Sequence, residues 1–178
     1  MTRKAIFLDR DGTLIVDHGY ICDPEQVELL PNIIPALKTI QSAGYLLIII
    51  SNQSGVGRGF FSIEDVEEVN QRLDELLKQN GIKIKGFFYC PHAPEEYCSC
   101  RKPKPGLVIN AMKEHRIEPS LSYLVGDKWT DVEAALNAGV MPVWITDNPY
   151  INTVHNSSVT ATPSLYSWVN LMGLEGGI

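Results

Sequence analysis

Two aspartates near the amino end of the chain stand one residue apart, in the segment Asp9-Arg10-Asp11-Gly12-Thr13. They follow a short apolar run, so they would leave the end of a strand together. Two carboxylates in this arrangement can face one hard cation such as Mg²⁺, which prefers oxygen ligands and also accepts phosphate oxygens. We expect Gly12 to permit a close backbone approach and Thr13 to hydrogen-bond within the loop. The segment therefore predicts chemistry on a phosphoryl group.

Further polar side chains follow other strands or loops of the predicted fold. They are Ser51, Asn52 and Gln53 after one apolar run, Arg101 and Lys102 after a cysteine-rich loop, and Gly126, Asp127 and Lys128 after another run. Any one of them taken alone would be a turn residue or a helix cap. Because ligands bind outside the carboxyl ends of the strands in open α/β sheets, their joint placement predicts one shared site.

The residue types suggest a division of roles within that site. Asp9, Asp11 and Asp127 are expected to hold Mg²⁺, with Asp11 contributing its side chain or its backbone carbonyl. A carboxylate beside Mg²⁺ can attack phosphorus, since the cation offsets the repulsion between the two anions. Lys102 and the Ser51 hydroxyl are suitable donors to the equatorial phosphoryl oxygens. Asp11 is the natural acid for the leaving oxygen and then the base for a hydrolytic water.

The cysteine-rich loop offers a second set of metal ligands. Its candidates are Cys90, His92, Cys98 and Cys100. Three thiolates and an imidazole form a common closed, structural zinc set, although this spacing differs from the usual Cys-x₂-Cys pattern. The alternative is a loop of reduced, unrelated cysteines, which the scarcity of cysteine elsewhere in the chain disfavours. We therefore expect Zn²⁺ to hold the loop 90–100.

The elements that must position these residues alternate between short apolar runs and amphipathic stretches, which predicts βαβ units and a mostly parallel sheet. The expected strands are Lys4–Leu8, Tyr45–Ile50, Ile84–Tyr89, Leu121–Val125 and Met141–Ile145. The expected helices are Pro31–Ala43, Ser62–Asn80, Pro105–His115, Asp131–Ala138 and a closing helix near Pro163–Leu171. Thr130 and Glu133 fit a capping box for the fourth helix. We predict a three-layer, Rossmann-like α/β sandwich, with residues 1–178 in a single domain.

No separate cap domain is expected over the site. The stretch Leu14–Leu47 is filled by one helix and the next strand, and Ser54–Cys100 is filled by a helix, a strand and the zinc loop. Neither leaves room for a second folded unit. The site should therefore be open, with its selectivity set by loops.

The composition narrows the class of partner. The formal net charge is −6, which argues against nucleic acid and anionic membranes as partners because both are polyanions. A local basic pocket can still bind a small phosphorylated substrate. There is no signal-peptide pattern and no apolar run of membrane-spanning length. We expect a cytoplasmic monomer.

Taken together, the motifs resemble those of the haloacid dehalogenase (HAD) superfamily. The first motif is matched by Asp9, Asp11, Gly12 and Thr13, the second by Ser51 and Asn52, the third by Lys102, and the fourth by Gly126, Asp127 and Asp131. The resemblance extends from the first strand to about Ile145. It implies Asp9 as a nucleophile that forms an aspartyl-phosphate, Asp11 as the acid and base, and Mg²⁺ as the cofactor.

The zinc loop, followed at once by Arg101-Lys102-Pro103, resembles the D-glycero-D-manno-heptose 1,7-bisphosphate 7-phosphatase family, which acts in heptose precursor synthesis for cell-surface polysaccharide. In that family the matching loops contact the substrate, and Arg101 matches a position that contacts the sugar's other phosphate. The substrate-binding residues that the resemblance implies are Thr13, Asp17, His18, Gly19, Tyr20, Asn52, Gln53, Ser54, Arg58, Arg101 and Lys128. The link between His92 and Cys98 is short, so the rim of the pocket should differ from that of members with a longer link.

Three other interpretations stay open. Histidinol-phosphate phosphatases of the same superfamily share the zinc loop and are the main alternative. A non-catalytic phosphosugar-binding module would need no nucleophile, whereas Asp9 and Asp11 are both intact. A zinc-dependent interaction module is disfavoured because nothing near the closed ligand set resembles an exposed apolar patch.

Overall fold

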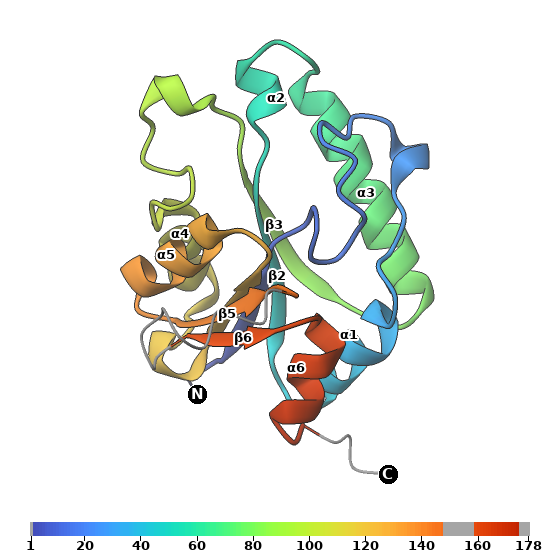
Figure 1. The fold of residues 1–178 in the computed structure, drawn as a ribbon, viewed down its shortest axis with the longest axis vertical. Coiled ribbons are helices and arrows are strands. Elements are labelled where there is room, and N and C mark those ends of the chain that lie inside the picture. The colour runs from blue at the N-terminus through green and yellow to red at the C-terminus, as the bar shows by residue number, and fades with distance from the viewer. Residues whose placement is uncertain (1, 148–158, 175–178) are drawn as a thin grey trace.

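A single parallel sheet organises the computed structural model, which describes residues 2–147 and 159–174. The strand order is β3-β2-β1-β4-β5-β6 (Figure 1). The strands are β1 (Ala5–Leu8), β2 (Leu46–Asn52), β3 (Ile84–Cys90), β4 (Tyr123–Gly126), β5 (Met141–Ile145) and β6 (Thr160–Thr162). The first five confirm the predicted strands with small shifts at their ends, and β6 is a further, short strand.

The helices also lie close to their predicted ranges. They are α1 (Ile33–Ser42), the short α2 (Ser54–Gly57), α3 (Ile63–Gln79), α4 (Gly106–His115), α5 (Trp129–Ala138) and α6 (Leu165–Leu171). The Ser62 hydroxyl caps α3 by accepting a hydrogen bond from the Asp65 amide, at 3.1 Å. Gly139 ends α5 with a left-handed φ of 75°, a conformation that costs glycine little.

The predicted capping box of the fourth helix, formed by Thr130 and Glu133, is wrong. The helix α5 begins earlier, at Trp129, so Thr130 already lies inside it. Its first turn is closed instead by Asp131, whose Oδ2 accepts a hydrogen bond from the Lys128 amide at 3.0 Å. A carboxylate at this position also interacts favourably with the positive end of the helix dipole.

Helices cover both faces of the sheet, which is why β1 is buried throughout. Its alternate side chains point to opposite faces, as in any strand. Ala5 and Phe7 belong to the core that α4 and α5 help to form, whereas Ile6 and Leu8 belong to the core with α1, α3 and α6. The result is the predicted three-layer α/β sandwich (Figure 1).

The connections between strands carry no separate cap. Between β1 and β2 the chain forms a short 3₁₀ helix and α1, and between β2 and β3 it forms α2 and α3. No second folded unit is inserted within 2–147. In the described ranges, none of the helices is long and apolar enough to cross a membrane.

The topology places the candidate residues at one edge. The chain passes from β1 to β2 and β3 on one side, then returns to β4 on the other side of β1. Such a reversal of direction opens a crevice at the carboxyl ends of the strands. Here Asp9 leaves β1 beside β4, and its amide donates to the Val125 carbonyl at 2.9 Å.

Candidate active site

The buried ammonium group of Lys102 lies at the centre of the site. Its Nζ is 2.6 Å from Asp9 Oδ1, 2.5 Å from Asp131 Oδ1 and 2.9 Å from the Ile50 carbonyl oxygen. Burial alone would lower the pKa of Lys102, but the carboxylates of Asp131 and Asp9 outweigh it and raise that pKa. The lysine is therefore a permanent cation at neutral pH, hydrogen-bonded to Asp9 and to the Ile50 carbonyl and ion-paired with Asp131.

Asn52 fixes the backbone that carries Lys102. Its side-chain oxygen accepts from the Lys102 amide at 3.0 Å, and its side-chain nitrogen donates to the Lys102 carbonyl at 3.1 Å. This pair of bonds joins the end of β2 to a residue fifty positions later in the chain. The substrate contact expected of Asn52 stays a prediction, since its amide holds the lysine in this structure.

Three carboxylates crowd around this lysine. Asp9, Asp127 and Asp131 each offer an oxygen, and these oxygens lie within 4.8 Å of one another. Burial, together with the charge of Asp9, raises the pKa of Asp127 to about 7. Burial also raises the pKa of Asp131 to about 6, with Lys102 opposing the rise. The cluster thus holds more negative charge than Lys102 neutralises.

Position 12 requires glycine because the Asp127 carboxylate of this cluster lies against its backbone. Its φ of +84° lies in the left-handed region, and a Cβ at this position would collide with the Asp127 carboxylate. The expected close backbone approach at Gly12 is therefore confirmed, and the group that approaches is Asp127.

The carboxylate of Asp11 is not part of this group of three. It is held by Arg10, whose Nε is 3.2 Å from each Asp11 oxygen, and by Gln53, whose Nε2 is 2.9 Å from Oδ2. The sequence predicted that Asp11 would join Asp9 and Asp127 as a metal ligand. In the structure the third carboxylate of that group is Asp131. Gln53 had been expected to contact substrate, and this structure pairs it with Asp11 instead.

Two buried hydroxyls in the site have no hydrogen-bond partner among the described residues. They are Ser51 Oγ, at the end of β2, and Thr13 Oγ1, in the first loop. The bond expected within the loop for Thr13 is made by its amide, which donates to the Arg10 carbonyl at 3.4 Å, and not by its hydroxyl. Buried polar groups are nearly always paired in native proteins, so these two unpaired hydroxyls suit a ligand that supplies acceptor oxygens.

A cleft of about 590 Å³ opens at the site. It is lined by Asp11 and Lys102 and by eight of the residues expected to bind substrate: Asp17, Gly19, Tyr20, Asn52, Gln53, Ser54, Arg101 and Lys128. Pro94, Pro103, Trp129 and Thr130 also line it and were not predicted. Their signal was weak, because each is an ordinary loop or helix-start residue in the sequence.

Three of the expected substrate residues lie outside the lining of this cleft. Thr13 borders a different cavity, His18 is exposed on its loop, and Arg58 lies 3.8 Å from Glu95 in an exposed ion pair. The substrate contacts of these three residues stay predictions.

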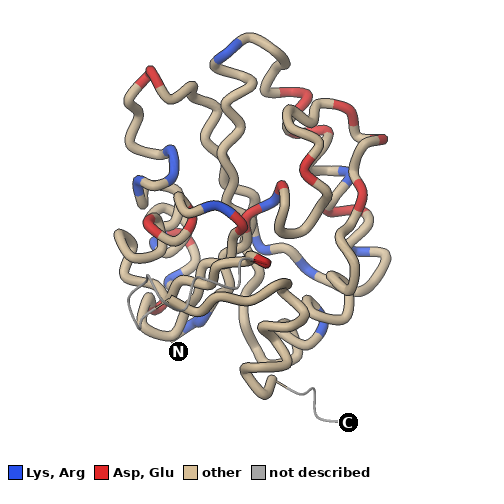
Figure 2. The backbone as a smooth tube through the Cα atoms, viewed as in Figure 1, with Lys and Arg blue, Asp and Glu red and all other residues tan. Residues whose placement is uncertain are grey.

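Two cations besides the buried Lys102 line the cleft, namely Lys128 and Arg101. Lys128 Nζ lies 3.1 Å from Asp17 Oδ2, and Asp17 in turn accepts from the Gly19 amide at 2.8 Å. Arg101 donates to the His92 carbonyl at 3.4 Å. Figure 2 shows many of the acidic positions gathered around α3 and the loop before α1. The negative net charge of the chain is thus compatible with a basic cleft.

The loop that carries Tyr20 is fixed by aromatic packing. The Tyr20 ring meets Phe60 edge-on with centroids 4.8 Å apart, and Phe61 lies 6.3 Å away. Edge-to-face pairs of this kind are favourable because of the ring quadrupoles. Tyr20 therefore lines the cleft from a supported position.

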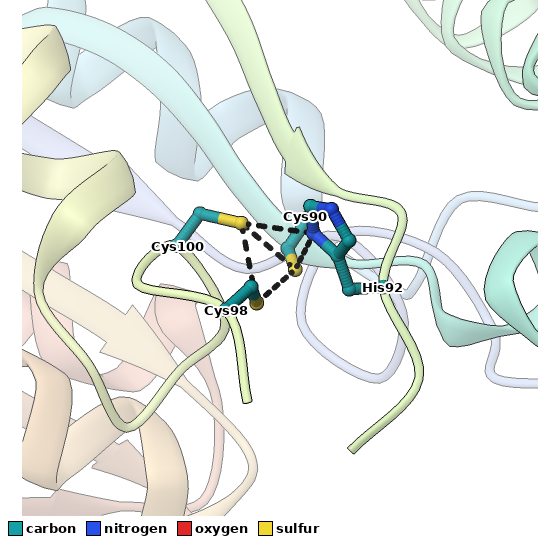
Figure 3. A group of neighbouring side chains, drawn as sticks. All are labelled: Cys90, His92, Cys98 and Cys100. Atoms are coloured by element: carbon teal, nitrogen blue, oxygen red, sulfur yellow. Dashed lines mark hydrogen bonds between the residues drawn. The ribbon is translucent and has the colours of Figure 1, made fainter. Parts of the chain in front are cut away.

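The four predicted zinc ligands converge (Figure 3). Cys90 Sγ lies 3.5 Å from both His92 Nδ1 and Cys98 Sγ, and Cys100 Sγ lies 3.1 Å from Cys90 Sγ and 3.4 Å from Cys98 Sγ. In a tetrahedral thiolate site with bonds of about 2.3 Å, the sulfurs would be about 3.8 Å apart. The donors are already gathered nearly as a zinc ion would hold them. The loop they form leads directly into Arg101 and Lys102.

The sequence of the chain is similar to those of known phosphatases. A family model described as HAD-hydrolase-like matches residues 99–163. A Helicobacter pylori protein named D-glycero-beta-D-manno-heptose-1,7-bisphosphate 7-phosphatase is 45% identical over 157 residues, which cover 87% of this chain and 90% of that protein. A Haemophilus ducreyi protein of the same name is 45% identical, covering 79% and 81% of the two chains.

The chain belongs to this phosphatase family. A crystal structure of D,D-heptose 1,7-bisphosphate phosphatase from B. bronchiseptica, complexed with magnesium and phosphate, superimposes with a TM-score of 0.87 at 25% identity. The match covers 98% of this chain and 99% of that one. As a member of the family, the chain is a phosphoric monoester hydrolase of the HAD superfamily.

Membership in the heptose bisphosphate phosphatase family implies a magnesium ion, and the residues of this chain suit it. Asp9, Asp127 and Asp131 supply oxygen donors, as a hard cation requires. Asp127 Oδ1 is buried and has no hydrogen-bond partner in the part of the chain that the structure describes. Burial and then the charge of Asp9 raise the pKa of Asp127, so its ionised form lacks a compensating positive charge. A divalent cation would give Asp127 Oδ1 a partner and would offset the negative charge of the carboxylate.

Proposed function

We propose that the chain hydrolyses the 7-phosphate of D-glycero-β-D-manno-heptose 1,7-bisphosphate. One observation carries the proposal beyond family membership. The cleft that reaches Asp11 and Lys102 is also lined by two further cations, Arg101 and Lys128. One reacting phosphate is served by Lys102 and the metal, so the additional cations suit a second phosphate on the same substrate.

The reaction follows from the placement of the chain's own groups. An oxygen of Asp9 attacks phosphorus and the bond from phosphorus to the sugar O7 breaks. The electron pair of that bond stays on O7, which takes a proton from Asp11. Lys102, already 2.6 Å from Asp9 Oδ1, keeps the nucleophile oriented. The unpaired Ser51 hydroxyl is available to donate to a phosphoryl oxygen.

The second half of the reaction frees the enzyme. A water molecule attacks the phosphorus of the aspartyl-phosphate and gives a proton to Asp11, while the bond between Asp9 and phosphorus breaks. Inorganic phosphate and the heptose 1-phosphate leave, and Asp11 is again protonated for the next cycle. Asp9, Asp127 and Asp131 would hold Mg²⁺, which would offset the negative charge that collects on the phosphoryl oxygens.

For the cysteine-rich loop we propose one structural Zn²⁺, bound by Cys90, His92, Cys98 and Cys100. The close approach of four soft donor atoms supports this assignment. The ion would act on catalysis through the loop, because Lys102 follows Cys100 after a single residue.

We also propose that the reaction takes place in the cytoplasm, where it would serve heptose precursor synthesis for cell-surface polysaccharide.

A panel of substrates tests the proposal. Phosphate release is measured from both anomers of heptose 1,7-bisphosphate and from histidinol phosphate, with and without Mg²⁺. The proposed function predicts the highest kcat/KM for the β-bisphosphate and little release without the metal. A preference for histidinol phosphate, which has a single phosphate, would instead support the alternative phosphatase. Binding of the bisphosphate without any release would identify a binding module.

A further inference from the structure

Arg10 is a charged side chain buried in the core of the site, with an exposed fraction of only 1%. Its guanidinium lies 3.2 Å from both Asp11 oxygens through Nε, and Nη2 lies 3.1 Å from Asp11 Oδ2. On its other side, Nη1 donates to Asn70 Oδ1 at 2.9 Å. A buried charge is costly unless it is paired and hydrogen-bonded. The contacts with Asp11 and Asn70 therefore offset the cost of burying the Arg10 charge. In doing so they hold the Asp11 carboxylate in place.

The contacts to the two oxygens of Asp11 are unequal. Oδ2 accepts from Arg10 Nε and from Gln53 Nε2 at 2.9 Å, and it also faces Arg10 Nη2. Among the described residues, Oδ1 accepts from Arg10 Nε alone. A carboxylate oxygen offers about two lone-pair positions, so Oδ2 has no capacity left for a proton. Oδ1 is then the oxygen with room for a further hydrogen-bond partner in the cleft.

Arg10 is in turn held by a helix that contributes nothing else to the site. Asn70 lies in the middle of α3 with an exposed fraction of 6%, so its side chain is fixed by packing. The line from Asn70 through Arg10 to Asp11 sets the direction of the carboxylate that lines the cleft. Proton transfer needs its donor within hydrogen-bond reach of the reacting oxygen, so this direction matters for rate.

We propose that Arg10 is a positioning residue, which fixes Asp11 so that Oδ1, the oxygen with fewer protein contacts, faces the leaving oxygen and then the attacking water. The proposal rests on the proposed function in that it needs Asp11 as the acid. It predicts a defect that depends on the leaving group. A sugar alkoxide needs a proton as it leaves, whereas p-nitrophenolate is weakly basic and leaves without one.

The test compares Arg10→Met with wild type on heptose bisphosphate and on p-nitrophenyl phosphate. The measured quantity is kcat/KM, which reports the steps up to transfer onto Asp9 and excludes the later hydrolysis. General acid catalysis contributes about 10²- to 10⁴-fold. We expect a loss of about 100-fold on the bisphosphate, at the low end of that range because Gln53 still holds Oδ2, and only a few-fold loss on p-nitrophenyl phosphate. The matched control is Arg72→Met, which removes an exposed arginine of α3 and should change neither value.

Equal losses of kcat/KM on the two substrates would overturn the proposal, because a purely structural role for Arg10 does not distinguish leaving groups. If Arg10→Met fails to fold, Asn70→Ala decides the matter. It removes the outer support of the guanidinium and should give the same imbalance, smaller in size. An equal loss, or none, would again overturn the proposal. A wild-type protein that leaves heptose bisphosphate intact refutes the proposed function instead, and the comparison then uses any alkyl phosphate that it cleaves.

Discussion

Arg101 is the residue through which the structure predicts a preference for a bisphosphate. Among the described residues, its side chain donates one hydrogen bond, a long one of 3.4 Å to the His92 carbonyl, and a guanidinium carries five N–H donors. Most of its donors are thus available to an anion in the cleft that it lines. A charge-assisted bond of this kind contributes about 1.5–3 kcal/mol. At about 1.4 kcal/mol for each tenfold change, Arg101→Ala should lower kcat/KM for heptose bisphosphate about 10- to 100-fold.

The assay measures kcat/KM for the bisphosphate and for p-nitrophenyl phosphate, which has no second phosphate. We expect little change on p-nitrophenyl phosphate, since the reacting phosphate is served by Lys102 and the metal. Lys113→Ala, on the exposed surface of α4, controls for the loss of one positive charge. Zinc content is measured in parallel because Arg101 bonds to the backbone of a proposed ligand. Equal losses on both substrates, with zinc retained, would show that Arg101 only supports the loop, and would favour histidinol phosphate as the substrate.

Three further predictions concern the metal sites and the fold around them. Cys98→Ser should lose the roughly one equivalent of zinc found by metal analysis of wild type, and should lower activity by displacing Lys102; full zinc with normal kinetics would contradict the assignment. Gly12→Ala should destabilise the protein by more than about 1 kcal/mol in urea unfolding, since φ is +84° and the new Cβ meets Asp127; an unchanged midpoint would refute this. Because burial and Asp9 raise the pKa of Asp127 from 3.8 to about 7, this group stabilises the metal-free protein below about pH 4, and that contribution is lost as the pH rises to about 7. Mg²⁺ should therefore raise Tm more at about pH 7.5 than at about pH 5, and an equal shift at both pH values would contradict it.

The sequence alone predicted most of the sheet and much of the site, and the physical reason is the same for both. Strands buried on two faces are continuous apolar runs, and the residues that follow them must meet at one edge. Asp9, Lys102 and Asp127 come from distant parts of the chain, and the structure brings all three together at that edge. The assignment of 1–178 to a single domain and the monomeric state stay predictions.

What the sequence could not show depends on contacts between distant residues. Arg10 is charged and would be expected at the surface, and its partner Asn70 is sixty residues away with no local pattern to mark it. Asp131 had been placed in the fourth motif, but its ion pair with Lys102 follows from the true start of α5. The amides of Asn52 and Gln53 were expected to face substrate, whereas here they hold Lys102 and Asp11. Side-chain choices of this kind are decided by packing in three dimensions.

The most direct experiment follows the fate of each phosphate by ³¹P NMR during turnover of β-heptose 1,7-bisphosphate by wild type and by Asp9→Asn. Wild type should release inorganic phosphate and leave the signal of the anomeric phosphate intact, giving heptose 1-phosphate. Asp9→Asn, checked for its fold by circular dichroism, should give no product because an amide cannot attack phosphorus. Release of the anomeric phosphate by wild type would contradict the assigned regiochemistry. Sustained turnover by Asp9→Asn would contradict the aspartyl-phosphate mechanism.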